Sequence, residues 1–410
     1  MAAWCNPRYC VYTRWMLPAS PPLRPLVPIT PVLSSASFRR AGAPAVRSVL
    51  DAGATRLVTS GRVAIALALR EMGVDAGDRV LVPAWHSPSM IPPVLWRGAT
   101  PVFYRVGPDG AADLEDIAAK AGGARALMAT HYFGFPQDLD ALRALCDAHG
   151  LTLLEDCAHA FIGEYDGRPL GSFGDYAIAS SMKFFPIYEG GVLVSASASL
   201  AQVALRSAGL GFEAKVTLNS LERGFAYGRL PAVHAALWLP MQLKGAAWRL
   251  LKSLRPAGAP APALAPDSSD SSFDFDPRWL DKRSSLFARA MLRLASPRRI
   301  AALRRAHYLR LDEGLHGLPG LRPLFGSLPV GVCPWVYPLV AEDPDGLAAR
   351  LDAAGVPVVR FGRPLWQGVD AATCANAAML SHSVLSLPCH QELRPAELDW
   401  LVAAVRKAAA

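Results

Sequence analysis

The feature that most constrains the fold is an alternation, between Arg56 and about Leu205, of short apolar runs with stretches of helical spacing. Residues 60–72 and 139–149 have the apolar spacing of amphipathic helices, and a glycine follows each stretch. Parallel strands need a crossover between them, usually a helix. The alternation therefore predicts a mostly parallel sheet wrapped by helices, an α/β fold. The apolar runs lie at residues 80–83, 100–104, 126–130, 151–155 and 191–195.

The rest of the chain divides into segments of different composition. Residues 237–254 are strongly apolar with three basic side chains, and residues 255–272 are rich in Pro, Ala and Ser, as is typical of a linker. Further on, strands expected at 334–340, 356–361 and 385–388 predict a second, smaller α/β domain. The expected organisation is a poorly ordered N-terminal extension over residues 1–31, a large domain over 32–230, an insertion over 231–296 and a small C-terminal domain over 297–410.

Charge and cysteine content exclude several classes of protein. The formal net charge of the 410 residues is +8, which suits anionic ligands such as phosphates better than a nucleic acid. Seven cysteines without a CxxC pair argue against a disulfide framework and a zinc site, and they favour a cytoplasmic location. We find no run of about 18 uncharged apolar residues, so a membrane-spanning helix is not expected. Neither a metal ion nor a nucleic-acid partner is predicted.

A carboxylate stands at the end of the apolar run that begins at Leu151. Leu153 and Leu154 precede Glu155 and Asp156, and open α/β sheets bind ligands at the carboxyl ends of their strands. A buried aspartate there can keep a pyridine nitrogen protonated, which is how proteins tune pyridoxal phosphate. Asp156 can equally be the N-cap of a following helix. On this run alone both interpretations stay open.

Lys183 lies between a small polar pair, Ser180 and Ser181, and the apolar residues 184–186. Apolar surroundings favour the neutral amine of a lysine, and a neutral amine can form an imine. The alternative is a surface lysine beside an exposed loop. The sequence Glu189-Gly190-Gly191 opens a strand directly afterwards, and two glycines let the backbone pass close to a bound group. This context favours the functional interpretation.

The segment Thr59-Ser60-Gly61-Arg62 opens a predicted helix with small residues. The first amides of a helix lack partners within it and can hold an anion such as phosphate. Arg62 can add positive charge to that site or point into solvent. The alternative is an ordinary Ser-capped helix, so this motif is weak by itself.

Taken in order, these pieces resemble the DegT/DnrJ/StrS aminotransferases, which act mostly on keto sugars. The resemblance covers about residues 56–195, is weak at 224–230 and returns at 385–390. It implies fold type I of the pyridoxal-phosphate-dependent transferases, with pyridoxal 5'-phosphate as cofactor in the large domain and a homodimer with active sites at the subunit boundary. The segments that carry it are Pro83 and residues 98–103, 130–134, 155–160 and 171–175.

The resemblance also assigns roles to individual residues. Lys183 would be the catalytic lysine that binds the cofactor as a Schiff base and shuttles protons, and Asp156 would be the partner of the ring nitrogen. His159 would lie near the phenolic oxygen, where the family often has Gln. Ser180 and the amides of residues 60–62 would bind the phosphate. The alternatives are a core histidine at 159 and a turn residue at 180.

Several positions depart from the family pattern. The family usually has a Ser five residues before the lysine, whereas Ser180 precedes Lys183 by three. The loop at 82–87 lacks the usual aromatic at Ser87, so Trp85 or His86 is expected to cover the cofactor ring, and which of them does so is left open. Ala226 stands where the family often has an Asn that reaches the phosphate of the partner subunit.

The predicted function is transamination from a donor such as glutamate to a keto substrate, a nucleotide-linked keto sugar used for surface polysaccharide or secondary metabolites. One alternative is a pyridoxal-phosphate-dependent lyase, or amine transfer to a lipid or polyketide, which altered loops and an apolar insertion would suit. Another is a regulatory homologue without turnover. Retention of Lys183 and Asp156 favours the transaminase.

The apolar and basic run at 236–255 has interpretations of its own. It is expected to touch a membrane surface peripherally or to cover the active site. The structural alternative is a helical hairpin packed at a dimer interface.

Overall fold

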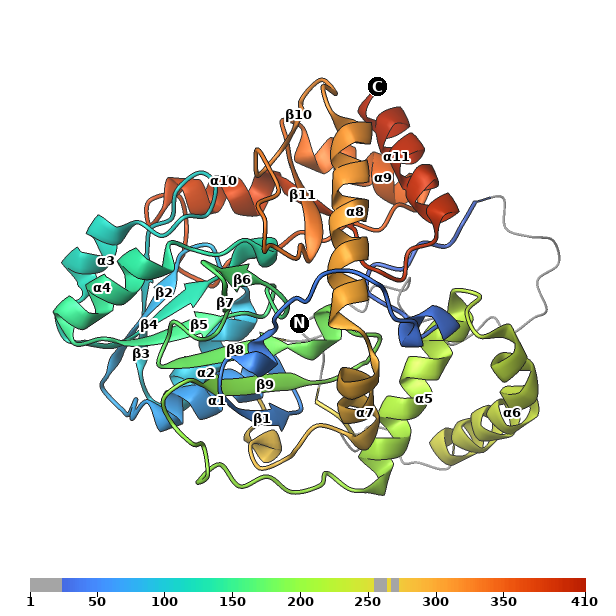
Figure 1. Cartoon of the computed structure of the whole chain (residues 1–410), viewed down its shortest axis with the longest axis horizontal. Helices are drawn as coiled ribbons and strands as arrows, with labels where there is room; N and C mark the ends of the chain where they lie inside the picture. Colours follow the sequence, from blue (N-terminus) through green and yellow to red (C-terminus); the bar gives the residue numbers. More distant parts are fainter. Residues whose placement is uncertain (1–23, 254–263, 267–272) are drawn as a thin grey trace.

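The computed structural model describes residues 24–253, 264–266 and 273–410. A seven-stranded sheet in the order β1-β9-β8-β5-β4-β2-β3 forms its centre (Figure 1). The pairs from β3 to β8 are parallel, whereas β8–β9 and β9–β1 are antiparallel. The strands are β1 (Ala54–Val58), β2 (Arg79–Pro83), β3 (Thr100–Tyr104), β4 (Ala124–Thr130), β5 (Thr152–Asp156), β8 (Tyr176–Ser180) and β9 (Gly191–Ser195), and β6 (Glu164–Tyr165) pairs with β7 (Arg168–Pro169) in a separate two-stranded sheet.

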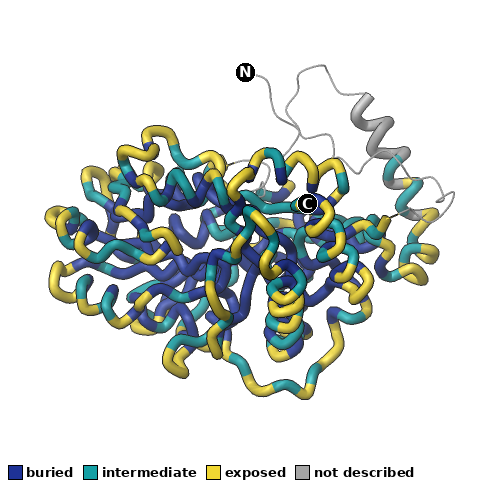
Figure 2. Tube along the Cα trace, turned by 90° about the horizontal axis from the view of Figure 1, so that it is seen from above, coloured by how far each residue is buried: buried dark blue, intermediate teal, exposed yellow. Residues whose placement is uncertain are grey.

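The predicted mostly parallel α/β fold is confirmed, and its strands are buried on both faces. Leu127 and Leu153 belong to one apolar core, while Met128 and Leu154 belong to another, because successive side chains of a strand point to opposite faces. Buried residues run through the centre of the molecule in Figure 2. The sequence pattern did not reveal β1 and β8, because both mix polar or small residues with apolar ones. The covering helices include α1 (Gly61–Glu71), α2 (Ile91–Trp96), α3 (Leu114–Lys120) and α4 (Leu139–His149).

A second, three-stranded antiparallel sheet lies in the C-terminal part of the chain. The strand expected at 356–361 is wrong: only Val359 pairs, through two backbone hydrogen bonds of 2.9 Å with Ser386, and the chain then turns at Gly362 with φ 69°. The pairing strand that the sequence did not reveal is β10. The elements are α8 (Pro297–Leu315), β10 (Leu321–Pro323), β11 (Val336–Ala341), α9 (Pro344–Ala354), α10 (Ala375–Ser383), β12 (Val384–Pro388) and α11 (Pro395–Ala409).

The N-terminal extension is described from Arg24 onward, and residues 1–23 lie outside the described part. Residues 24–31 are not a loose extension, because they pack on the small domain. Val27 is buried, and the carbonyl of Pro28 lies 2.9 Å from Nε2 of His390. Arg24 hydrogen-bonds to the carbonyl of Ala354 at the end of α9.

The region between the two sheets contains α5 (Leu210–Ala226), α6 (Pro231–Ser253) and α7 (Leu286–Leu294). In Figure 1, α6 lies at the edge of the molecule, away from the large sheet. Most of the predicted linker at 255–272 lies outside the described residues; residues 264–266 are the exception. Among the described helices, none combines the length and apolar character needed to cross a membrane.

Candidate active site

The strand ends of the large sheet and the N-terminus of α1 surround one open cavity of about 720 Å³, a volume that includes space at its solvent-facing mouth. Thr130, Asp156 and Ser180 end three neighbouring parallel strands, β4, β5 and β8, so they lie at the same edge of the sheet. Of the predicted site residues, those that line the cavity are Ser60, Gly61, Arg62, Asp156, His159, Ser180 and Lys183.

Asp156 is buried at the floor of this cavity. Its Oδ1 accepts a hydrogen bond of 2.9 Å from the amide of Ala158, and its Oδ2 a longer one of 3.4 Å from the hydroxyl of Thr130. Burial raises the pKa of the Asp156 carboxyl, while the Ala158 amide and the nearby charge of Lys183 act in the opposite direction. The capping interpretation fails in part, because a turn follows Asp156 and no helix begins there. The carboxyl is therefore available to a positively charged ligand group.

The preceding carboxylate, Glu155, has a structural role. It accepts hydrogen bonds from the amides of Gly171 (2.9 Å), Phe173 (2.7 Å) and Gly174 (2.5 Å). The amide of Gln137 donates to Nδ1 of His131, so Nε2 of His131 carries the hydrogen and donates to Glu155 over 3.2 Å. Two adjacent carboxylates thus differ: Glu155 is saturated, whereas Asp156 faces the cavity.

His159 and Lys183 both contact the indole ring of Trp335. The His159 ring stacks on Trp335 with centroids 4.0 Å apart, and Nζ of Lys183 lies 4.5 Å from the centroid of the Trp335 ring. Burial lowers the pKa of His159 well below its usual range, and the charge of Lys183 acts in the same direction. The amide of Phe133 donates to Nδ1 of His159 over 3.4 Å, so the neutral ring carries its hydrogen on Nε2. His159 is thus a hydrogen-bond donor at the cavity.

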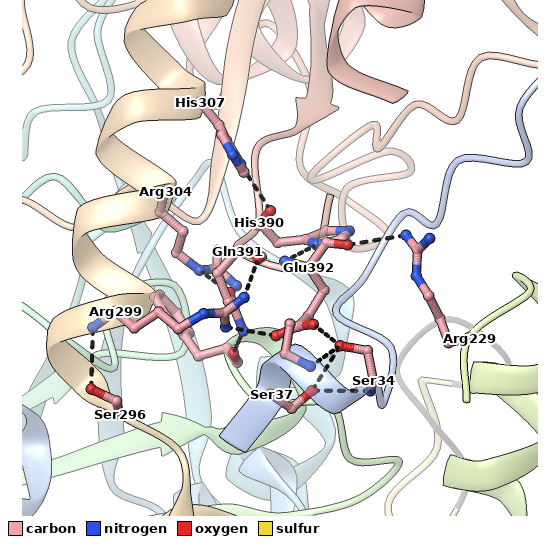
Figure 3. A network of polar contacts seen from close by, with 12 residues as sticks. Ser34, Ser37, Arg229, Ser296, Arg299, Arg304, His307, His390, Gln391 and Glu392 are labelled. Carbon is pink, nitrogen blue, oxygen red and sulfur yellow. Dashed lines mark hydrogen bonds and ion pairs between the residues drawn. The ribbon is translucent and has the colours of Figure 1, made fainter. Parts of the chain in front are cut away.

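The loop that carries Lys183 is held from the C-terminal part of the chain. Arg304 of α8 is fully buried and donates to the carbonyls of Lys183 (2.8 Å), Trp335 (2.9 Å) and Pro334 (3.1 Å). Its Nε donates to the side chain of Gln391 (2.9 Å), whose own amide donates to the carbonyl of Phe184 over 2.7 Å. Figure 3 shows Arg304 and Gln391 pointing toward each other within a larger buried polar network.

Three of these residues, Trp335, Arg304 and Gln391, were absent from the predicted site. Local sequence pattern carries no signal for them, because Arg304 is one of several arginines in α8 and Trp335 stands just before a strand of the small domain. Only the packing of α8 and of residues 335 and 391 against the loop of Lys183 brings them to the lysine.

The N-terminus of α1 combines the functional and the capping interpretation. Ser60 is the N-cap, and its hydroxyl accepts a hydrogen bond of 3.3 Å from the amide of Val63. Gly191 must be glycine, because a Cβ there would collide with the carbonyl of Ser60. The hydroxyls of Thr59 and Ser181 are buried and have no hydrogen-bond partner within the described part of the chain. Arg62 does not point into solvent, since it donates to the carbonyl of Asp274 over 2.5 Å.

The expectation that Trp85 or His86 covers a cofactor ring is not met, because neither lines the cavity. The Trp85 ring is fully buried and stacks on Tyr132 with centroids 4.5 Å apart. Nδ1 of His86 lies 2.9 Å from the carbonyl of Ala84, and Nε2 accepts from the amide of Trp366 over 3.2 Å. Burial lowers the pKa of His86 to about 4, so its ring is neutral and fully used inside the protein.

Comparison with known proteins gives the family. The model of the DegT/DnrJ/EryC1/StrS aminotransferase family matches residues 45–253. The chain belongs to this family. The family predicted from the motifs is thereby confirmed.

Curated relatives match over part of their length. The GDP-perosamine synthase of Vibrio cholerae is 37% identical over 153 residues, which are 36% of this chain and 42% of that protein. The dTDP-3-amino-3,4,6-trideoxy-alpha-D-glucose transaminase of Streptomyces venezuelae is 33% identical over 237 residues, 54% of this chain and 60% of that protein. In both, the matched part is less than two thirds of the relative.

Solved structures establish the fold of this family for nearly the whole chain. The aminotransferase TlmJ of Streptoalloteichus hindustanus has a TM-score of 0.62 at 23% identity and covers 86% of this chain and 85% of its own. The PLP-form of the putative sugar aminotransferase Spr1654 of Streptococcus pneumoniae has a TM-score of 0.63 at 16% identity and covers 93% and 98%.

Pyridoxal phosphate is the cofactor of the family, and the cavity fits it. The start of α1, where the first amides have no acceptor within the helix, suits a phosphate, as does the hydroxyl of Thr59, which has no hydrogen-bond partner among the described residues. Asp156 suits a protonated pyridine nitrogen, and Lys183 supplies the amine that can bind a carbonyl carbon. These groups line one cavity, so a single molecule can reach all of them.

Proposed function

We propose that the chain is a pyridoxal-phosphate-dependent aminotransferase that takes an amino group from a donor such as glutamate and passes it to a keto substrate. The observation that carries this proposal is that Lys183, Asp156 and the N-terminus of α1 line a single cavity. Bound pyridoxal phosphate supplies a carbonyl carbon that exchanges amino groups and a ring that accepts electrons. The residues of the chain supply its binding, its orientation and the movement of protons.

Asp156 keeps the ring nitrogen protonated. A positive charge next to its buried carboxyl replaces the solvation that burial removes, and the ionised carboxylate then holds the proton on that nitrogen. The Ala158 amide at 2.9 Å fixes the orientation of the carboxylate. His159 would donate through Nε2 to an oxygen of the bound cofactor, since its Nδ1 is already an acceptor.

Nζ of Lys183 would take up and return the proton of the substrate carbon that carries the amino group. Its ammonium group lies over the ring of Trp335, which restrains it by a cation–π contact and shields it from water on that side. Arg304 and Gln391 hold the backbone of Lys183 and Phe184, so the amine returns to the same place after each half-reaction. Phe361 lines the cavity and excludes further water.

For the substrate we propose a nucleotide-linked keto sugar, used for surface polysaccharide or secondary metabolites. Two relatives, a GDP-perosamine synthase and a dTDP-3-amino-3,4,6-trideoxy-alpha-D-glucose transaminase, support this class. The cavity opens to solvent, which leaves room for a bulky group outside it.

The near-visible absorption spectrum tests the function. Purified protein is loaded with pyridoxal phosphate, and the band of the bound cofactor is followed while glutamate is added. A band that glutamate bleaches, and that a keto acid restores, is the expected result for a ping-pong transaminase. Lys183→Ala removes the amine and abolishes the response, while Lys407→Ala, an exposed lysine on α11, is the matched control and keeps it. A band that persists unchanged with several amino donors contradicts the proposal.

We further propose a cytoplasmic homodimer. The cysteines described as free, Cys146, Cys157, Cys333, Cys374 and Cys389, are all buried, which suits a reducing compartment. Large apolar side chains are exposed near α5 and α7, among them Leu210 (88%) and Leu286 (64%), and they support a contact with a second copy. Sedimentation of the purified protein tests the dimer.

Helix α6 supports the further proposal that residues 236–255 touch a membrane surface peripherally. Trp238, Leu239 and Leu243 are more than half exposed there. Flotation with anionic vesicles tests this contact, and the protein is expected to float with them. Failure to float, with α6 protected from protease only in the dimer, would place this helix at the subunit interface instead.

A further inference from the structure

A buried carboxyl that the proposed mechanism does not use lies in the wall of the cavity. Glu189 is 3% exposed and lines the cavity beside Lys183. Its Oε1 accepts three hydrogen bonds, from the hydroxyl of Ser284 (2.8 Å) and from the amide (2.8 Å) and hydroxyl (2.9 Å) of Ser285. Its Oε2 is equally buried and has no hydrogen-bond partner among the residues that the structure describes.

This asymmetry fixes where a proton on Glu189 lies. An oxygen that accepts three hydrogen bonds has no lone pair left for a proton, so a proton must sit on Oε2. Burial raises the pKa of Glu189 to about 7, against the effect of the Ser284 and Ser285 donors, and the charge of Glu213 raises it further. Near neutral pH, therefore, Oε2 exchanges between an O–H donor and a bare carboxylate oxygen.

Glu189 lies next to the turn at residues 59–61, where the phosphate of the cofactor is proposed to bind. The amide of the following residue, Gly190, donates to the carbonyl of Thr59 over 2.9 Å, and Gly191 touches the carbonyl of Ser60. The hydroxyl of Thr59, like Oε2 of Glu189, has no hydrogen-bond partner among the described residues. An ionised carboxylate beside this turn repels a phosphate, whereas a protonated carboxyl can donate a hydrogen bond to it.

Other charged or titratable groups lie near Glu189. Their effects on the pH dependence of binding must be separated from the effect of Glu189. Glu213 of α5 acts on Glu189 directly and is itself held by the amide of Leu286 over 2.8 Å. Among the described residues, the other charged or titratable groups that line the cavity are Arg62 of α1, Asp156 of β5, His159 after β5, Lys183 of η6 (Ser181–Lys183) and Tyr188 beside Glu189. Arg283 precedes Ser284 in the chain.

We propose that Glu189 is a proton-dependent phosphate ligand, whose Oε2–H donates to the phosphate group of the cofactor at the N-terminus of α1. This inference rests on the proposed function, because it takes the cavity to be the cofactor site. It makes the phosphate contribution to binding depend on proton uptake by Glu189. The cofactor then binds more weakly as the pH rises above neutrality, without any change in the protein fold.

The test compares pyridoxamine phosphate with pyridoxamine, which lacks the phosphate, by direct binding titration between about pH 6 and pH 8.5. Neither compound reacts covalently with Lys183, so activity is not the readout. In the natural protein, the ratio of the two affinities is expected to fall toward tenfold per pH unit once the pH exceeds the pKa of Glu189. In Glu189→Gln the amide is a permanent donor, so the ratio falls only as far as titration of the phosphate itself requires.

Two further variants test the same titration without altering Glu189. Glu213→Gln removes the charge that raises the pKa of Glu189 and keeps an acceptor for Leu286, so the fall should begin at a lower pH. Ser284→Ala removes a donor that stabilises the carboxylate, so the fall should begin at a higher pH. Shifts of opposite sign from these two variants cannot arise from general destabilisation.

The outcomes separate this inference from the proposed function. If pyridoxamine phosphate binds but Glu189→Gln and the natural protein share one pH profile, Glu189 is not a phosphate ligand, and the aminotransferase proposal stands. If pyridoxamine phosphate does not bind at any pH, both proposals are overturned. A Glu189→Gln profile that is flatter than that of the natural protein, with the two opposite shifts, supports the inference.

Discussion

The two sides of the cavity are built in different ways. On one side, Asp156 and Ser180 come from the ends of β5 and β8, and the third group is the N-terminus of α1. Each is placed by the strand or helix to which it belongs. The C-terminal part of the chain contributes Trp335 and Arg304, which contact Lys183, and Gln391, which contacts Phe184 beside it. All three lie more than a hundred residues further along the chain. In the proposed mechanism, the first side contacts the cofactor and the second holds Lys183. Chemistry and positioning are then divided between the two sides.

If this division is correct, Asp156→Asn should affect catalysis without affecting the fold. The amide cannot hold the ring nitrogen protonated, so kcat should fall about 1,000-fold, equivalent to about 4 kcal/mol of barrier. Burial disfavours the charged form of Asp156, so the free energy of unfolding of the cofactor-free protein should not decrease. Steady-state kinetics and chemical denaturation measure the two effects. A large loss of stability would make Asp156 a structural residue and break the comparison.

Substitution on the other side should do the reverse. Arg304→Met leaves the carbonyls of Lys183, Pro334 and Trp335 without their buried donor, which should lower the free energy of unfolding by roughly 3–4 kcal/mol. Arg310→Met, on the exposed face of the same helix, is the matched control and should change it by less than about 0.5 kcal/mol. Denaturant titration measures the free energy of unfolding of both variants. Equal effects would show that Arg304 does not anchor the loop of Lys183.

Glu189, held by Ser284 and Ser285, should make the stability of the cofactor-free protein depend on pH. Its pKa is raised from 4.5 to about 7 in the folded state, so the folded protein retains a proton that the unfolded chain releases. The contribution is fully present below about pH 4.5 and is lost as the pH rises through about 7, a change of up to about 3 kcal/mol. Glu189→Gln should flatten this part of the stability profile. An unchanged profile would show that Glu189 is ionised in the folded protein.

The smallest expected effect concerns two serine caps, one on each side. Ser60→Ala and Ser296→Ala each remove an N-cap hydrogen bond of 3.3 Å, from α1 and α8 respectively, and each should cost about 1 kcal/mol of stability. Only Ser60→Ala should also weaken binding of pyridoxal phosphate, because only α1 opens at the cavity. Thermal melting and cofactor titration measure both. Equal cofactor affinities would show that the α1 N-terminus does not hold the phosphate.

Sequence reasoning reached the large-domain side well, because its signals are local. A run of apolar residues ending in Asp156, a lysine before a glycine pair and a small-residue helix start each reflect a strand end, a loop or a cap. Parallel strands then bring these pieces to one edge of the sheet. The strands β1 and β8 were missed because polar and small residues interrupt their apolar pattern.

The positioning side could not be predicted from local pattern. Trp335 and Arg304 have no unusual neighbours in sequence, and their role arises only when α8 and β11 dock on the lysine loop. The prediction for Trp85 and His86 was wrong for the opposite reason. Aromatic residues in a loop expected to face the cofactor suggest ring stacking, but here their rings stack on Tyr132 and Phe103 inside the protein. Pattern identifies a residue type, whereas packing decides which way it faces.

The central claim is that Lys183 is the residue that carries the cofactor. Protein loaded with pyridoxal phosphate is reduced with borohydride, digested, and analysed by mass spectrometry for the lysine that retains the reduced cofactor. The account predicts the label on the peptide that contains Lys183, with none on that peptide when glutamate is added before reduction. A label on another lysine, or no stable label at all, would contradict it.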